Sequence, residues 1–439
     1  MPYAPCADFT LRHPSDEALA AYAEELAAEI GKTARFYDET GGFPSEHFEL
    51  LRQRGALKLT IPRALGGRGL SLYELLIFQE RLAKGSASTA LSLGWHLMAL
   101  GYLSFDLKWP RPAFERLCRG VVQRGDLVNI LITERDGGNL LRGGKAATVA
   151  HKTGEGYVIS GRKAFCSAAP ALNQMILYAW DEQAGKTAEF LVPRTPDVHV
   201  VENWNSLGMR STGSHDIEFD GVLVPHEAKL LEIEKDQPSS FTTGSRAFGL
   251  QVAAVYLGIA AAARDFILEF ADSRQSPSLG SAILDAPHAQ QKLGEIELLL
   301  SASKTQLYGL AELWERHDAL KHRLHHEVWT TKYMVTNNAV RIVELAMGIA
   351  GGHGLSRDFP LERYWRDVQC GLHNPPQNDM VVSTLAQAAT RDYRQRRREA
   401  EKPAAPGASA QTAPVETTAQ AESTVSQTAS IPTEEAVFH

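Results

Sequence analysis

The chain has 439 residues, of which 44% are hydrophobic and 22% are charged, as in a folded globular protein of two or three domains or layers. Its 52 acidic and 45 basic residues leave a formal net charge of −7, which argues against a nucleic-acid-binding role. The one basic cluster, "YRQRRR" (Tyr393–Arg398), falls near the expected end of a helix, where cations are favoured in any case.

The sequence also indicates no metal site, disulfide framework or membrane partner. Its four cysteines share no short spacing. The N-terminus lacks the basic-then-apolar pattern of a signal peptide. Two uncharged runs, residues 85–105 and 247–263, are rich in small residues, and we interpret both as buried core helices rather than membrane spans. We therefore expect a cytoplasmic protein.

Taken in chain order, the first two segments differ in their periodicity. Residues 1–127 carry apolar positions at helical spacing and predict an N-terminal helical domain. Residues 128–231 contain short alternating runs such as "QMILYAW" and "AEFLVP", separated by Gly, Asp, Asn and Pro. This texture predicts a middle domain of antiparallel strands.

The remaining two segments complete an α+β chain. Residues 232–400 return to long helices with apolar faces and predict a C-terminal helical domain. Residues 401–439 consist largely of Ala, Thr, Ser, Pro, Glu and Gln. Such a composition buries too little apolar surface to offset chain entropy, so it predicts a disordered tail.

Four motifs point to one superfamily. They are "LITERDGGN" (131–139), "GRKAFCS" (161–167), "WNSLGMRSTGSHDIEFDGVLVP" (204–225) and "GIAGGHGLSRDFPLERYWRD" (348–367). Through their order and spacing the chain resembles the acyl-CoA dehydrogenases and the flavin-dependent monooxygenases related to them. The resemblance implies a helical domain, a middle antiparallel β domain and a C-terminal four-helix bundle.

The resemblance also implies a flavin, FAD or alternatively FMN. A flavin ring needs an aromatic face, hydrogen-bonding groups for its polar edge and close backbone approach to its phosphates. The residues that the motifs place at the cofactor are Thr133, Gly138, Asn139, Phe165, Ser167, Arg274, Gly351, Gly352 and Gly354. Taken singly, each also fits an ordinary hairpin, turn or core position.

The glycines of the last motif approach the flavin of a neighbouring subunit in this family, which implies a homodimer or homotetramer. Four positions depart from the family pattern. Arg135 replaces a proline, Asn139 replaces a serine, and Gly348 stands where the dehydrogenases usually have a glutamine. Arg274 lies two residues before the position of the arginine that contacts the neighbour's pyrophosphate.

The usual catalytic base is missing. In acyl-CoA dehydrogenases a glutamate removes the α-proton of the thioester, but its two known positions fall on Pro375 and Ser245 here. Asp379, one helical turn beyond Pro375, is the remaining carboxylate that could take this role.

The loop "HNPP" resembles instead the His-Asn/Asp-Pro loop of the monooxygenase branch. There, reduced flavin reacts with oxygen to a hydroperoxide, and a histidine near flavin N5 stabilises or protonates it, which makes His373 the catalytic candidate. The alternative is a loop histidine bonded to a backbone carbonyl. We also assign His96 and Arg210 to the substrate, with a buried core histidine as the alternative for His96.

These observations predict an FAD-dependent oxidoreductase and slightly favour a monooxygenase that acts on a small organic substrate with reduced flavin from a partner reductase. An acyl-CoA dehydrogenase using His373 or Asp379 as its base, with an electron-transfer flavoprotein as partner, is the alternative. A non-redox thioester enzyme or a silent flavoprotein is a third possibility.

Overall fold

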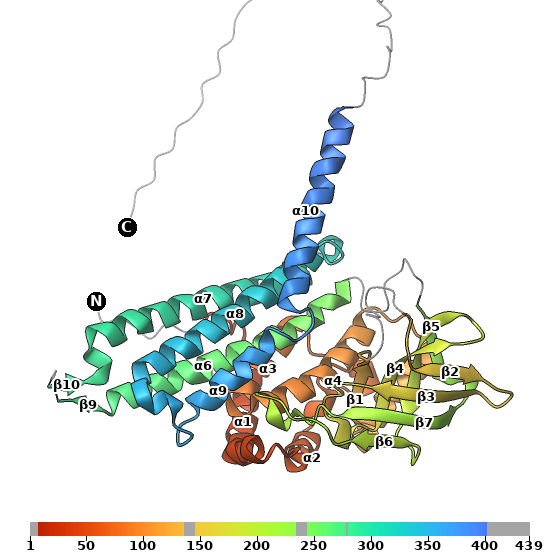
Figure 1. Ribbon diagram of the computed structural model, residues 1–439, viewed down its shortest axis with the longest axis horizontal. Coiled ribbons are helices and arrows are strands. Elements are labelled where there is room, and N and C mark those ends of the chain that lie inside the picture. The colour runs from red at the N-terminus through yellow and green to blue at the C-terminus, as the bar shows by residue number, and fades with distance from the viewer. Residues whose placement is uncertain (1–7, 136–144, 234–243, 278–279, 402–439) are drawn as a thin grey trace, which may run out of the picture. The chain divides into compact units, whose positions relative to one another are not determined.

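The computed structural model of the protein describes residues 8–135, 145–233, 244–277 and 280–401 (Figure 1). Two predicted cofactor residues, Gly138 and Asn139, and the predicted tail from residue 402 onward lie outside these ranges. The chain divides into two compact units, residues 1–386 and 387–439. The first unit contains the sheet, the bundle and the candidate site.

The segment before the sheet is helical, as predicted. Its helices are α1 (Pro14–Thr40), α2 (Ser45–Gln53), α3 (Leu72–Gly85), α4 (Ala87–Phe105) and α5 (Arg111–Arg124). Helix α3 begins with a capping box, because the Ser71 side chain accepts from the Glu74 backbone and the Glu74 side chain accepts from the Ser71 backbone. Helix α3 packs against α1 on one side and against α6 (Gln251–Asp272) on the other.

The middle segment forms one sheet. Its strands are β1 (Val128–Leu131), β2 (Val149–Lys152), β3 (Tyr157–Lys163), β4 (Gln174–Asp181), β5 (Lys186–Pro193), β6 (Val198–Val201), β7 (Asp216–Val224) and β8 (Lys229–Glu232). Their order across the sheet is β6-β7-β3-β2-β4-β5-β8, with β1 paired to β4.

The sheet is mixed, whereas the sequence pattern led us to expect antiparallel strands. Most neighbours are antiparallel, but β1 and β2 both run parallel to β4, with Val128 opposite Gln174 and Ala150 opposite Asp181. Alternation of apolar and polar residues marks a strand in either direction. Strand direction depends on which strands become neighbours, and the sequence pattern does not specify that.

The C-terminal segment is a helical bundle. Its elements are η7 (Gly244–Leu250), α6, β9 (Gln275–Ser276), β10 (Ser281–Ala282), α7 (Pro287–Arg316), α8 (His325–Ala350), η10 (Gly351–Leu355), α9 (Leu361–Gly371) and α10 (Asn378–Ala400). Helix α8 contacts α6, α7 and α9, and α6 also contacts α7 and α9 (Figure 1), which confirms the expected four-helix bundle. The predicted boundaries at residues 127 and 231 remain predictions.

The two uncharged runs are core helices, as predicted. Nearly every residue of α4 is buried, and α6 is buried along most of its length. The stretch Arg246–Asp272 is long and apolar enough to cross a membrane, but 83% of its most apolar window is covered by protein. Its apolar character is therefore accounted for by packing.

Glycine allows α3 to approach both of its neighbours closely. A Cβ added at Gly85 would lie 2.1 Å from the carbonyl oxygen of Ala27 in α1. A Cβ added at Gly258 of α6 would lie 2.3 Å from the carbonyl oxygen of Glu80 in α3. Main-chain atoms of a packed helix cannot move aside as a side chain can, so both crossings require glycine.

We expect Gly85→Ala to destabilise the protein by about 1–3 kcal/mol, because overpacking against a backbone carbonyl outweighs the better helix propensity of alanine. Gly31→Ala at the same crossing is the matched control, since its added Cβ would lie 3.5 Å from Gly85, an ordinary contact. Urea unfolding measures both variants. Equal stabilities would contradict the close α1–α3 approach at Gly85.

Candidate functional site

The loop between β6 and β7, residues 202–215, joins the sheet to the C-terminal bundle. Gly208 lies so close to α9 that an added Cβ would be 2.1 Å from the carbonyl oxygen of Arg366. The next backbone N–H, that of Met209, donates to Oδ1 of Asp367 at 2.5 Å. Asp367 is buried, and burial raises its pKa to about 6. Backbone contacts therefore fix the loop on α9.

The same loop is bonded to the N-terminal helices. Ser92 of α4 donates from Oγ to the carbonyl of Thr212 at 3.1 Å. Arg210, which we predicted to contact substrate, donates from Nε to the carbonyl of Asp38 at 2.7 Å and from Nη1 to the carbonyl of Ser206 at 3.2 Å. Its guanidinium links the loop to the end of α1, which is a structural role.

Phe165 presents an exposed aromatic face beside this loop. It has a φ of +56°, a strained conformation for a bulky side chain, and 56% of its surface is exposed. Its ring meets that of Trp204 edge-on, with 6.2 Å between centroids. The backbone N–H of Cys166 donates to the carbonyl of His215 at 3.0 Å, which fixes the turn. A strained, exposed aromatic residue fits a ligand-facing position.

Ser167 begins a row of buried hydroxyl groups. Its Oγ lies 2.9 Å from Oγ of Ser214, which lies 2.7 Å from Oγ1 of Thr212. Oγ1 of Thr212 in turn donates to the carbonyl of Met209 at 3.0 Å. Nδ2 of Asn129 in β1 donates to the carbonyl of Ser167 at 3.0 Å. The side chain of Ser167 is therefore held from the protein interior.

Sequence reasoning missed these supporting residues. Asn129 lies inside a strand, and nothing in the sequence distinguishes it from a polar edge residue. Thr212 and Ser214 belong to a quoted motif, and their spacing of two residues was a usable signal. The contact of Trp204 with Phe165 depends on the path of the loop between β6 and β7, which no local sequence pattern specifies.

Thr133 lies on the loop after β1. Its side chain is exposed, and its carbonyl accepts the backbone N–H of Ala164, the residue before Phe165, at 2.8 Å. The next residue, Glu134, accepts from Nζ of Lys163 at 2.6 Å, and both side chains are almost completely buried. This buried pair anchors the loop beside the Phe165 turn.

His373 is exposed on the loop between α9 and α10. Oδ1 of Asn374 accepts from the hydroxyl of Tyr256 at 2.5 Å, and the carbonyl of Pro376 accepts from Nζ of Lys332 at 2.9 Å. Both donors are buried, and burial lowers the pKa of Lys332 to about 8. In the described ranges no hydrogen bond or ion pair reaches the His373 imidazole. The loop is thus held by α6 and α8, not by the histidine.

Asp379, the alternative base, lies in the first turn of α10 and is exposed. A carboxylate at this position interacts favourably with the helix dipole. This structural role accounts for the residue without a catalytic one.

The other predicted cofactor residues lie away from the Phe165 turn; they are Arg274, Gly351, Gly352 and Gly354. Nη1 of Arg274 lies 3.2 Å from Nε2 of His353 in η10, and a Cβ added at Gly351 or Gly352 would meet nothing within 4 Å. Gly354 is buried, and a Cβ added there would lie 3.0 Å from the carbonyl oxygen of Met347 in α8. In Figure 1, β9, which follows Arg274, and the sheet lie at opposite ends of the first unit. One chain therefore does not bring both groups together.

His96 is a core histidine, and we do not retain it as a substrate residue. It is completely buried, its Nε2 lies 2.7 Å from the carbonyl of Leu57, and its Nδ1 accepts the backbone N–H of Val128 at 3.0 Å. These bonds assign the ring proton to Nε2. Both nitrogens are occupied in joining α4 to β1, so neither is available to a ligand.

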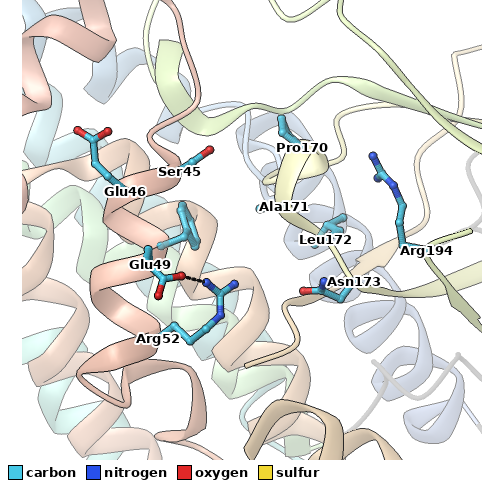
Figure 2. A pocket seen from close by; sticks show the side chains of 10 residues that line it. Ser45, Glu46, Glu49, Arg52, Pro170, Ala171, Leu172, Asn173 and Arg194 are labelled. Atoms are coloured by element: carbon cyan, nitrogen blue, oxygen red, sulfur yellow. Dashed lines mark hydrogen bonds and ion pairs between the residues drawn. The ribbon is translucent and has the colours of Figure 1, made fainter. Parts of the chain in front are cut away.

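A pocket of about 520 Å³ opens between α2 and the segment after Ser167 (Figure 2). Figure 2 shows Glu46 and Glu49 on one wall and Arg194 on the other. None of the predicted site residues lines it. We therefore place the candidate site at the Phe165 turn and not in this pocket.

In chain order, a helical segment, a sheet and a four-helix bundle follow one another, and an exposed aromatic residue stands beside a row of buried hydroxyl groups on the sheet. This combination is typical of a class of flavin-dependent oxidoreductases. The chain matches the N-terminal, middle and C-terminal domains of acyl-CoA dehydrogenase over residues 14–105, 129–222 and 250–374. It is 39% identical over 365 residues to YdbM of Bacillus subtilis (strain 168), which carries a provisional acyl-CoA dehydrogenase name, and the match covers 83% of this chain and 94% of that protein. The chain belongs to the acyl-CoA dehydrogenase family.

Two solved structures extend the comparison to relatives in complex with FMN. KijD3 in complex with FMN and a dTDP-amino-keto sugar has a TM-score of 0.75 and 26% identity, covering 88% of this chain and 95% of that one. TdsC of Paenibacillus sp. A11-2, a dibenzothiophene monooxygenase in complex with FMN and indole, has a TM-score of 0.73 and 25% identity, covering 82% and 94%. The expected family and fold are thereby confirmed, and dehydrogenases and monooxygenases both occur among the relatives.

The buried His96 predicts an acid-sensitive contribution to stability. Burial lowers its pKa to about 4, whereas an unfolded histidine titrates near about 6.5. The folded state therefore favours the neutral ring, and this stabilisation is complete above about pH 6.5 and is lost as the pH falls toward 4. The expected loss is on the order of 3 kcal/mol.

In His96→Gln a side chain that does not titrate replaces the imidazole. We expect the free energy of unfolding of this variant, measured in urea, to change less between pH 7.5 and pH 4.5 than that of the wild type. His47, whose pKa burial also lowers to about 4, is present in both proteins and cancels in the difference. Parallel pH profiles would show that His96 does not carry this effect.

Proposed function

We propose that the protein is a monooxygenase that binds reduced flavin supplied by a partner reductase and oxygenates a small organic substrate in the cytoplasm. The observation that supports this most is the loop between α9 and α10. The family's usual glutamate position is Pro375, and the loop offers His373 in place of a carboxylate. Without a base, removal of a thioester α-proton has no evident acceptor.

The hydrogen bonds that hold the loop between α9 and α10 are compatible with a catalytic imidazole at His373. Tyr256 and Lys332 hold residues that follow His373, so the ring is left exposed on a fixed backbone. Such an imidazole can hold a proton for a reacting group or donate one. A purely structural histidine would be expected to bond the loop that it stabilises.

The Phe165 turn fits a flavin. We propose that Phe165 packs on the ring, that Ser167 hydrogen-bonds its polar edge and that Thr133 lies beside it. A bound flavin supplies the electrons for reaction with oxygen. The FMN complexes of KijD3 and TdsC support FMN, the alternative to FAD.

We further propose that Arg274, Gly351, Gly352 and Gly354 face a neighbouring copy of the chain in a homodimer or homotetramer. The open space at Gly351 and Gly352 supports this proposal. So does the contact of Arg274 with His353, because β9, which follows Arg274, lies at the opposite end of the first unit from the sheet (Figure 1). Glycines that meet nothing in their own chain allow another chain or its cofactor to approach the backbone.

Acyl-CoA dehydrogenation is the second candidate, with His373 or Asp379 as base and an electron-transfer flavoprotein as acceptor. The 39% identity with YdbM favours it. It requires the exposed imidazole or the carboxylate in the first turn of α10 to act as the base on a thioester.

One anaerobic and one aerobic measurement distinguish the monooxygenase from the dehydrogenase. In the first, the FAD-loaded protein is mixed with a panel of acyl-CoA thioesters without oxygen, and we expect no bleaching of the flavin. In the second, the protein with reduced FMN is mixed with oxygen and indole, and we expect oxygenated product or slowed release of H2O2 relative to free flavin. Rapid bleaching by any thioester would establish the dehydrogenase instead.

We expect His373→Ala to keep the fold and the flavin affinity of the wild type, because the loop is held from α6 and α8. In the aerobic reaction it should divert reduced flavin to H2O2 and lower the product yield by about 100-fold or more, as is typical for loss of a positioned proton donor. His199→Ala, which removes another exposed histidine from the sheet, is the control. An unchanged product yield in His373→Ala would contradict the assignment.

A further inference from the structure

The hydroxyl row behind Ser167 has a defined direction of hydrogen bonding. The Met209 carbonyl can only accept, and besides Nε1 of Trp204 and the backbone N–H of Thr212, both at 3.2 Å, it accepts the hydroxyl proton of Thr212 at 3.0 Å. Thr212 then has no proton for Ser214, and their oxygens lie 2.7 Å apart, so Ser214 must donate to Thr212. By the same reasoning Ser167 must donate to Ser214 across 2.9 Å.

Burial keeps this order in place. Only 1% of Thr212, 6% of Ser214 and 8% of Ser167 is exposed, so water does not readily replace these bonds. If the Ser167 proton turned outward, the Ser167 and Ser214 oxygens would face each other with lone pairs only, and one buried hydrogen bond would be lost. The oxygen of Ser167 is therefore left with lone pairs, and no proton, for a ligand.

We infer that Thr212 and Ser214 make Ser167 a hydrogen-bond acceptor and thereby select reduced over oxidised flavin. This rests on the proposed contact between Ser167 and the flavin. N5 carries a hydrogen in reduced flavin and only a lone pair in oxidised flavin, by the cofactor's own chemistry. An acceptor at Ser167 complements the N5–H group of the reduced form and repels the lone pair of the oxidised form. This preference suits an enzyme that receives its flavin already reduced.

The test measures dissociation constants of oxidised FMN and of FMN reduced anaerobically, together with the midpoint potential of bound FMN. Ser214→Ala and Thr212→Val each free the Ser167 proton to turn outward. We expect both to lower the ratio of the oxidised to the reduced dissociation constant by about three- to tenfold, the value of one hydrogen bond. A tenfold change lowers the potential of the two-electron couple by about 30 mV.

Two control variants isolate the hydroxyl row from general disturbance. Thr212→Ser keeps the hydroxyl and should keep the wild-type ratio. Ser92→Ala removes a neighbouring hydroxyl that bonds the Thr212 carbonyl rather than the row, and it should also leave the ratio unchanged. Circular dichroism melting establishes that each variant is folded, and Thr212→Val serves if Ser214→Ala does not fold.

The outcomes separate this inference from the proposed function. If Ser167→Ala alters neither dissociation constant, Ser167 does not contact flavin and the proposed site is wrong. If Ser167→Ala weakens binding but Ser214→Ala and Thr212→Val leave the ratio unchanged, the site stands and the inference is overturned. It is also overturned if both constants change equally, because Ser167 would then meet the N3–H group that both redox states carry.

Discussion

The contact between Gly208 and the carbonyl of Arg366 is the constraint on which the candidate site depends. Only glycine allows a loop of the sheet to rest directly on the backbone of α9, and the Met209–Asp367 bond then fixes the loop in register. One end of this loop continues through Thr212 to Ser214, behind the Phe165 turn. The helix on which it rests ends at Gly371, two residues before His373. This backbone contact therefore joins the loop behind the Phe165 turn to the helix that precedes His373.

Charge pairing reinforces this junction. Arg366 forms a two-pronged ion pair with Asp38 of α1, at 3.0 and 2.6 Å, and a further pair with Glu362. Arg210 reaches the carbonyl of the same Asp38 from the loop. Because these side chains are partly or fully buried, the interactions are screened less than surface pairs and join three segments that are distant in sequence. The site is thus assembled from α1, α9 and the sheet together.

Much of the fold could be predicted from the sequence, because its signals are local. The Ser71–Glu74 capping box and the uncharged runs that became α4 and α6 carry their physical reasons within a few residues. The parallel pairing of β1 and β2 with β4 could not be predicted, since side-chain alternation is independent of strand direction. From the sequence, His96 could be either a buried core residue or a substrate residue. Only the positions of the Leu57 and Val128 backbones, which bond its ring, decide between these alternatives. The hydroxyl row likewise depends on where the loop from β6 returns to the sheet.

The most direct test of the proposed site is a crystal structure of the protein with FMN. We predict that the flavin ring packs on Phe165 with N5 at hydrogen-bonding distance from Oγ of Ser167, and that the imidazole of His373 lies beside the same ring. Electron density for the ring in the pocket between Glu49 and Arg194, or a ring bound with Ser167 and His373 both remote from it, would contradict the assignment of the site.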